Sequence, residues 1–207
     1  MDIWGRMAPR YDAFIRRFVT EQYSEIVYKT WNSFAEDKSL IEIGAGTGAI
    51  SLEIARKVKK ITVTDISERM LDIAKQKALT RGVENADFVV ADGGDLPFAA
   101  EQFDGCLIIN VLHVIKDPLA CLKEARRLLK PDGLLIVSTF CHGEGIKEKL
   151  ISTAMSLATG IVFRKLTMAD ITHAVETAGF YVVEKQRMEG AIPLLFLAAT
   201  PYQQKKS

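Results

Sequence analysis

The feature that most constrains this chain is the run LIEIGAGTG at residues 40–48, in which apolar residues lead to an acid and then to three alternating glycines. We interpret it as a buried strand and a glycine turn, followed by a helix over residues 49–56. Glycine permits positive φ and lets a ligand approach the backbone, and the new helix presents N–H groups to that ligand. Strand–turn–helix units of this kind bind nucleotide-like cofactors at the carboxyl ends of parallel strands. The alternative is an ordinary glycine-rich connection.

Strand-like and helix-like segments alternate from Ser39 onward. Ser67 and Asp117 are predicted helix N-caps, Gly82 a helix stop, and residues 130–133 a turn. The strands have continuous apolar runs, which suit a parallel sheet covered on both faces. After residues 40–43, the expected strands are 61–65, 86–91, 103–110 and 134–139.

The C-terminal part of the chain departs from this alternation. Residues 143–163 carry a second helical stripe, and Thr167 with Asp170 is a capping signal for the next helix. Two strand-like runs, 180–184 and 194–199, then follow with no helical pattern between them, so they should pair as an antiparallel hairpin. The sequence therefore predicts an α/β fold with a doubly wound, mostly parallel seven-stranded sheet. We expect one domain over residues 1–207, with its α/β core at 38–200.

Residues 1–37 carry no strand signal. Apolar side chains recur there at spacings of three and four, which is typical of amphipathic helices. These extra N-terminal helices could form a lid over the site, a fixed packing layer, or the face of a homodimer. The first stripe consists of Trp4, Met7, Tyr11, Phe14 and Phe18.

Composition excludes several classes of function. The net charge of +1 gives no reason to expect nucleic-acid binding. Three widely spaced cysteines without a CxxC pair argue against a structural zinc site and favour reduced thiols. We find no run of about 18 apolar residues and no apolar signal segment. We therefore expect a cytoplasmic protein without stable membrane insertion.

Four motifs, taken in order, resemble those of the class I S-adenosylmethionine-dependent methyltransferases. They lie at residues 42–48, 63–67, 91–98, and 103–110 followed by 129–133. The closest similarity is to the small type 11 group, which includes quinone-biosynthesis C-methyltransferases. The resemblance implies a Rossmann-like methyltransferase fold and S-adenosylmethionine as cofactor, with S-adenosylhomocysteine as product.

The resemblance also implies roles for individual residues. Asp65 would accept from both ribose hydroxyls, since a carboxylate has two acceptor oxygens. Ile66 would lie against adenine, Asp92 would accept from its amino group, and the N–H of Gly93 would reach a ring nitrogen. Asn110 would lie near the sulfonium. The residues that would line or support the methionine end are Glu42, Gly44, Ala45, Gly46 and Gly48.

Two other functions fit part of the sequence. Gly44, Gly46 and Ala49 also satisfy the looser dinucleotide pattern, with Asp65 at a plausible ribose distance, so an NAD(P)-dependent oxidoreductase is the main alternative. The motif at 91–98 and the C-terminal hairpin favour the methyltransferase. A cofactor-binding protein without catalysis is the third option.

The acceptor is less constrained than the cofactor. Apolar stripes in the N-terminal helices and at 143–163 favour a small, partly apolar molecule. Tyr11 and His113 are the candidate substrate-side residues, His142 is a weaker one, and His173 is expected to be structural. No metal site is expected. Whether carbon, nitrogen, oxygen or sulfur is methylated, and whether a general base is used, stays open.

Overall fold

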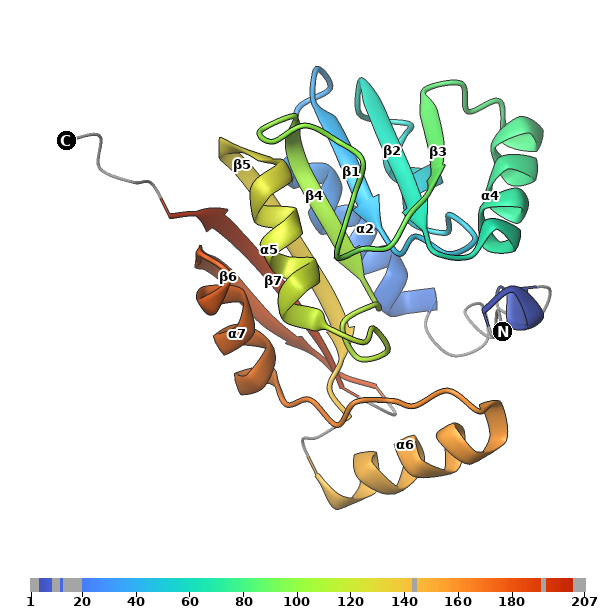
Figure 1. The fold of residues 1–207 in the computed structure, drawn as a ribbon, viewed down its shortest axis with the longest axis vertical. Coiled ribbons are helices and arrows are strands. Elements are labelled where there is room, and N and C mark those ends of the chain that lie inside the picture. The colour runs from blue at the N-terminus through green and yellow to red at the C-terminus, as the bar shows by residue number, and fades with distance from the viewer. Residues whose placement is uncertain (1–3, 9–11, 13–19, 143–144, 191–192, 203–207) are drawn as a thin grey trace. The chain divides into compact units, whose positions relative to one another are not determined.

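The structure is a computed structural model, which describes residues 4–8, 12, 20–142, 145–190 and 193–202 (Figure 1). The chain divides into two compact units, Met1–Pro97 and Phe98–Ser207. No helix in the described ranges is long and apolar enough to cross a bilayer.

The N-terminal unit is built on a parallel three-stranded sheet with the order β3-β2-β1. Its register pairs Ile43 with Thr64 and Asp65 with Val90, so the carboxyl ends of the three strands lie at one edge. The elements are α2 (Thr20–Ser33), β1 (Ser39–Ile43), α3 (Ser51–Ile54), β2 (Lys60–Asp65), α4 (Glu68–Arg81) and β3 (Ala86–Val90).

Local sequence explains where α4 begins and ends. The Ser67 side chain accepts from the Met70 N–H at its start, and Gly82 adopts the left-handed conformation at its end. Both predicted caps are confirmed. The helix buries one face, and β1 and β2 are buried along most of their length.

The C-terminal unit contains a four-stranded sheet with the order β4-β5-β7-β6. β4 and β5 are parallel, whereas β7 runs antiparallel to both β5 and β6, so the predicted hairpin is confirmed. Helices α5 and α7 lie side by side along this sheet, and α6 stands apart from it (Figure 1). The elements are β4 (Phe103–Ile109), α5 (Pro118–Leu128), β5 (Leu129–Phe140), α6 (Ile146–Thr159), α7 (Met168–Thr177), β6 (Phe180–Met188) and β7 (Leu194–Pro201).

Residues 130–133 do not form the separate turn that was predicted. Strand β5 starts at Leu129, directly after α5, and its register with β4 shifts between Leu129 and Leu134. The Lys130 ammonium lies 2.8 Å from the Asp104 carboxylate, which holds this irregular stretch against β4. The turn-forming residues therefore form a bulge within the strand.

Two helical predictions also need adjustment. The helix after the glycine turn is only the four-residue α3 rather than residues 49–56. The stripe at 143–163 does form α6, but Ile146, Leu150 and Leu157 on it are more than 60% exposed. In the first N-terminal stripe residues 4–8 are helical, whereas Tyr11, Phe14 and Phe18 lie outside the described residues.

Candidate cofactor and acceptor sites

The conformation of the turn after β1 requires glycine at several of its positions. Gly44, Gly46 and Gly48 all have positive φ angles, between 55° and 72°, which residues other than glycine rarely adopt. A Cβ added to Gly48 would lie 3.1 Å from the Ala74 Cβ, so this glycine also permits the turn to approach α4. The Ala45 N–H donates to the Thr64 carbonyl at 2.8 Å and fixes the turn to β2.

Asp65, at the end of β2, faces this turn. Its Oδ2 accepts from the Gly46 N–H at 2.8 Å and its Oδ1 from the Ser67 N–H at 2.9 Å. The residue is 8% exposed. A carboxylate has about four acceptor sites, so these backbone bonds are compatible with accepting ribose hydroxyls as well. The predicted ribose-binding carboxylate is therefore fixed in place by the glycine turn itself.

Glu42 is a second buried carboxyl beneath the turn. It accepts a hydrogen bond from the Ser51 hydroxyl at the start of α3. Burial raises its pKa to about 8, and the negative charge of Asp65 adds to the rise. Glu42 therefore links the end of β1 to the start of α3, and its supporting role at the methionine end stays a prediction.

The adenine-side candidates lie at the carboxyl ends of β2 and β3. Ile66 is 62% exposed directly after buried Asp65, so it offers an apolar face to a flat ring. The exposed Asp92 accepts from the Gly94 N–H at 2.9 Å, which shapes the turn that contains Gly93. The arrangement fits an adenosine group held between a buried ribose acceptor and an exposed apolar side chain.

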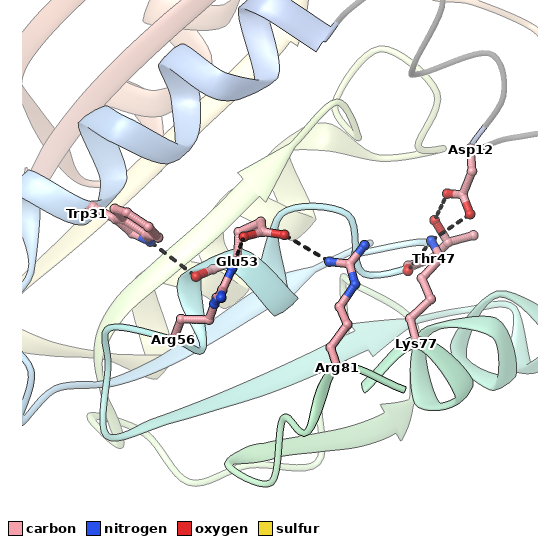
Figure 2. Close-up of polar contacts among 7 residues, drawn as sticks. All are labelled: Asp12, Trp31, Thr47, Glu53, Arg56, Lys77 and Arg81. Atoms are coloured by element: carbon pink, nitrogen blue, oxygen red, sulfur yellow. Dashed lines mark hydrogen bonds and ion pairs between the residues drawn. The ribbon is translucent and has the colours of Figure 1, made fainter. Parts of the chain in front are cut away.

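Two residues outside the predicted set also fix the glycine turn, as Figure 2 shows. The Thr47 hydroxyl donates to Asp12 Oδ1 at 2.6 Å, and the Lys77 ammonium lies 2.6 Å from Asp12 Oδ2. Lys77 also donates to the Thr47 carbonyl at 2.9 Å. No sequence signal identifies Lys77, because it lies in an ordinary polar stretch of α4. Tyr11, the predicted substrate-side residue next to Asp12, lies outside the described residues.

Helix α2 packs against other elements of the N-terminal unit. The Trp31 indole N–H donates to the Glu53 carbonyl at 3.2 Å, and the Glu53 carboxylate pairs with Arg81 at 2.9 Å (Figure 2). Ile26 on the same helix is fully buried. These contacts fit a packing role for α2, and the choice among lid, packing layer and dimer face stays a prediction for the N-terminal helices.

The C-terminal unit carries the other predicted residues. Asn110 closes β4 with a positive φ of 58°, which is uncommon for a residue other than glycine, and its N–H donates to the Ser138 carbonyl. His113 is buried, and its Nδ1 lies 2.8 Å from the Thr139 hydroxyl. Burial lowers the pKa of His113 to about 3, and neighbouring His142 contributes to the shift. Its imidazole is therefore neutral near pH 7.

The sequence favours His113 over His142 as a substrate-side residue. In the structure their ring centroids are only 5.0 Å apart. His142 is 1% exposed, and burial lowers its pKa to about 4. Adjacent Cys141 directs its thiol to the Thr139 carbonyl, so it does not form a nucleophile pair with His142. His173 is exposed on α7. Within the described ranges, no group of three or more potential metal ligands forms.

Comparison with known proteins agrees with this geometry. Residues 41–137 match the family described as "Methyltransferase domain". The chain is 31% identical over 156 residues to the ubiquinone/menaquinone biosynthesis C-methyltransferase UbiE of Rhizobium meliloti, and 36% identical over 105 residues to a demethylmenaquinone methyltransferase of Tropheryma whipplei. These alignments cover 69% and 51% of this chain.

Residues 41–137 are thus a methyltransferase domain, and the chain resembles the class I S-adenosylmethionine-dependent methyltransferases. The quinone-biosynthesis relatives agree with the predicted resemblance to the type 11 group. The alignments with these two relatives cover 58% and 43% of their own lengths. S-adenosylmethionine is the cofactor of this family.

Solved structures agree on the fold. A methyltransferase from Thermotoga maritima matches with a TM-score of 0.76 at 23% identity, covering 97% of this chain and 100% of that one. One from Aquifex aeolicus matches with a TM-score of 0.73 at 18% identity, covering 95% and 98%. The fold is thus the predicted Rossmann-like methyltransferase fold, with seven strands of which β7 is antiparallel to its partners.

Proposed function

We propose that this methyltransferase transfers a methyl group from S-adenosylmethionine to a small, quinone-like molecule. The observation that carries the proposal is the bond between the Asp65 carboxylate and the Gly46 N–H, which joins the ribose candidate to the glycine turn. When bound, the cofactor supplies an already activated methyl group for in-line displacement, so alignment accounts for much of the catalysis. We assign the cofactor-binding role to the predicted residues of the N-terminal unit, from Glu42 to Gly93, and keep Asn110 as a separate prediction for the C-terminal unit.

The acceptor assignment is supported by the names of the relatives, which act in quinone biosynthesis. The apolar stripe of α6 supports a partly apolar acceptor. We propose Tyr11 and His113 as substrate-side residues, a cytoplasmic location, and no role in binding nucleic acid. We propose the N-terminal segment ahead of α2 as the lid. A second proposed role of the exposed α6 stripe is to form the interface of a homodimer.

Isothermal titration tests the cofactor. We expect S-adenosylhomocysteine to bind and NADH not to bind. Binding of NADH without binding of S-adenosylhomocysteine would overturn the proposal and favour the oxidoreductase. For the acceptor, labelled cofactor is incubated with a panel of cell metabolites that includes reduced quinones, and mass spectrometry identifies what gains the label.

A further inference from the structure

Four rings meet at the carboxyl ends of β4 and β5. They belong to His113, Phe140, His142 and Phe163. The Phe163 ring is stacked on His113 at 5.8 Å between centroids and lies 5.2 Å from the His142 ring. We call this set the ring cluster. It lies entirely within the C-terminal unit.

The two histidines of the ring cluster differ in their hydrogen bonding. His113 is partnered by the Thr139 hydroxyl, whereas neither ring nitrogen of His142 has a hydrogen-bond partner among the residues that the structure describes, although His142 is 1% exposed. A neutral imidazole offers one donor and one acceptor, and buried polar side chains are normally satisfied. A bound molecule that pairs with one of these nitrogens would explain why an imidazole is placed here.

One member of the ring cluster, Phe163, belongs to a segment outside the helices and strands. Phe140 and Phe163 are both half-buried. Phe163 lies in residues 160–167, which form neither helix nor strand, and the next residue is attached to the cluster by the bond from the Arg164 N–H to the His113 carbonyl. A change of the Phe163 rotamer would therefore open one side of the ring cluster without breaking that backbone bond.

We propose that the ring cluster is an acceptor subsite for a flat aromatic ring that carries a hydroxyl group, with the hydroxyl bonded to His142. A hydroxyl both donates and accepts, as a neutral imidazole does, whereas a carboxylate only accepts and an ammonium only donates. The acceptor ring would take over the stacking contacts that Phe163 makes. This inference rests on the proposed function, since it specifies the acceptor of the same reaction.

The test compares 1-naphthol with 1-methylnaphthalene, which has a similar shape and no hydroxyl. Binding is followed by long-range 1H–15N spectra of the histidine rings, with S-adenosylhomocysteine present. The chain has only three histidines, so exposed His173 serves as an internal control. We expect 1-naphthol to shift the signals of His142 and His113 and to bind about 3- to 10-fold more tightly than 1-methylnaphthalene, the scale of one hydrogen bond.

The variant His142→Leu removes the hydrogen-bonding atoms and keeps an apolar side chain in the ring cluster. It should bind the two ligands equally, retain the wild-type affinity for S-adenosylhomocysteine, and unfold at no lower temperature. His173→Gln should retain the hydroxyl preference. No binding of 1-naphthol up to its solubility, no shift of the His142 signals, or a preference that persists in His142→Leu would each overturn the inference. Failure of the proposed function would instead be seen as lack of S-adenosylhomocysteine binding.

Discussion

In the N-terminal unit the buried carboxyls of Glu42 and Asp65 both accept hydrogen bonds from the chain. In the C-terminal unit the buried imidazole of His142 has no such partner within the described ranges. The buried carboxyls at the glycine turn therefore have hydrogen-bond partners in the chain, whereas the ring cluster contains a buried imidazole that lacks one in the described part of the chain. A cofactor shared by a whole family can be served by a fixed turn. An acceptor specific to one member needs side chains that become satisfied only when it binds. The difference indicates where specificity resides.

The largest effect should come from a side chain introduced into the glycine turn. Gly48→Ala combines positive φ, at about 1–2 kcal/mol, with overpacking against Ala74 and Leu52, at about 1–3 kcal/mol. We expect the free energy of unfolding, measured by urea denaturation, to fall by about 2–5 kcal/mol. Gly82→Ala is the matched control, since Gly82 also has positive φ but no atom within 4 Å of an added Cβ. Equal losses in both variants would show that close approach at Gly48 is unimportant.

Glu42 should make the N-terminal unit less stable as pH rises. Its pKa is about 8 in the folded chain, compared with 4.5 in the unfolded chain. Burial is the largest cause of this rise, and the charge of Asp65 is the smallest. Below pH 4.5 the carboxyl is protonated in both states. As pH rises from 4.5 to about 8, only the unfolded state ionises, so the free energy of unfolding falls, by about 2–4 kcal/mol. Glu42→Gln should lose this dependence in urea titrations. A variant as pH-sensitive as wild type would mean that Glu42 is ionised in the fold.

His142 should have the opposite effect on the C-terminal unit. Its pKa is lowered by burial from 6.5 to about 4. Above pH 6.5 both states are neutral, and as pH falls towards 4 only the unfolded state takes up the proton, so stability decreases by up to about 3 kcal/mol. The titratable side chain beside this ring is His113, which stays neutral over this pH range because its own pKa is lowered to about 3. His142→Leu should be less sensitive to acid, and His173→Gln should match wild type. If acid sensitivity is unchanged in His142→Leu, the imidazole is not buried in solution.

Asp65→Ala tests the ribose role. We expect binding of S-adenosylhomocysteine, measured by titration, to weaken by about 1.5–3 kcal/mol, the scale of hydrogen bonds to a charged partner. The N–H groups of Gly46 and Ser67 also lose their acceptor, so stability should fall too. Asp65→Asn keeps one acceptor oxygen and the size of the side chain, and it separates the two effects. Unchanged affinity in a folded Asp65→Ala variant would refute the ribose role.

The sequence was sufficient for the parts of the molecule that depend on local chemistry. Caps at Ser67, Asp117 and Thr167 are read directly, because each uses a side chain that bonds within three residues. The bulge at 130–133 was missed because it belongs to the pairing of β5 with β4, and this pairing, like the contact of Lys130 with Asp104, joins residues far apart in sequence. The same holds for Lys77 at the glycine turn and for the ring cluster, whose members are up to 50 residues apart. Sequence motifs were therefore enough to predict the cofactor, whereas the bulge, the role of Lys77 and the ring cluster depend on tertiary contacts.

The smallest effect should come from Asp12, which attaches the N-terminal segment to the glycine turn. Its pairing with Lys77 is only partly buried, so Asp12→Ala should weaken S-adenosylhomocysteine binding by about 1 kcal/mol or less. Asp72→Ala is the control, since Asp72 pairs with Lys75 on the same helix and is more exposed. If the segment is a lid, hydrogen exchange of residues 3–18, most of which lie outside the described residues, should slow when S-adenosylhomocysteine binds. This slowing should be smaller in Asp12→Ala. Equal, strong protection with and without ligand would show a fixed layer, and the proposed lid would then be abandoned.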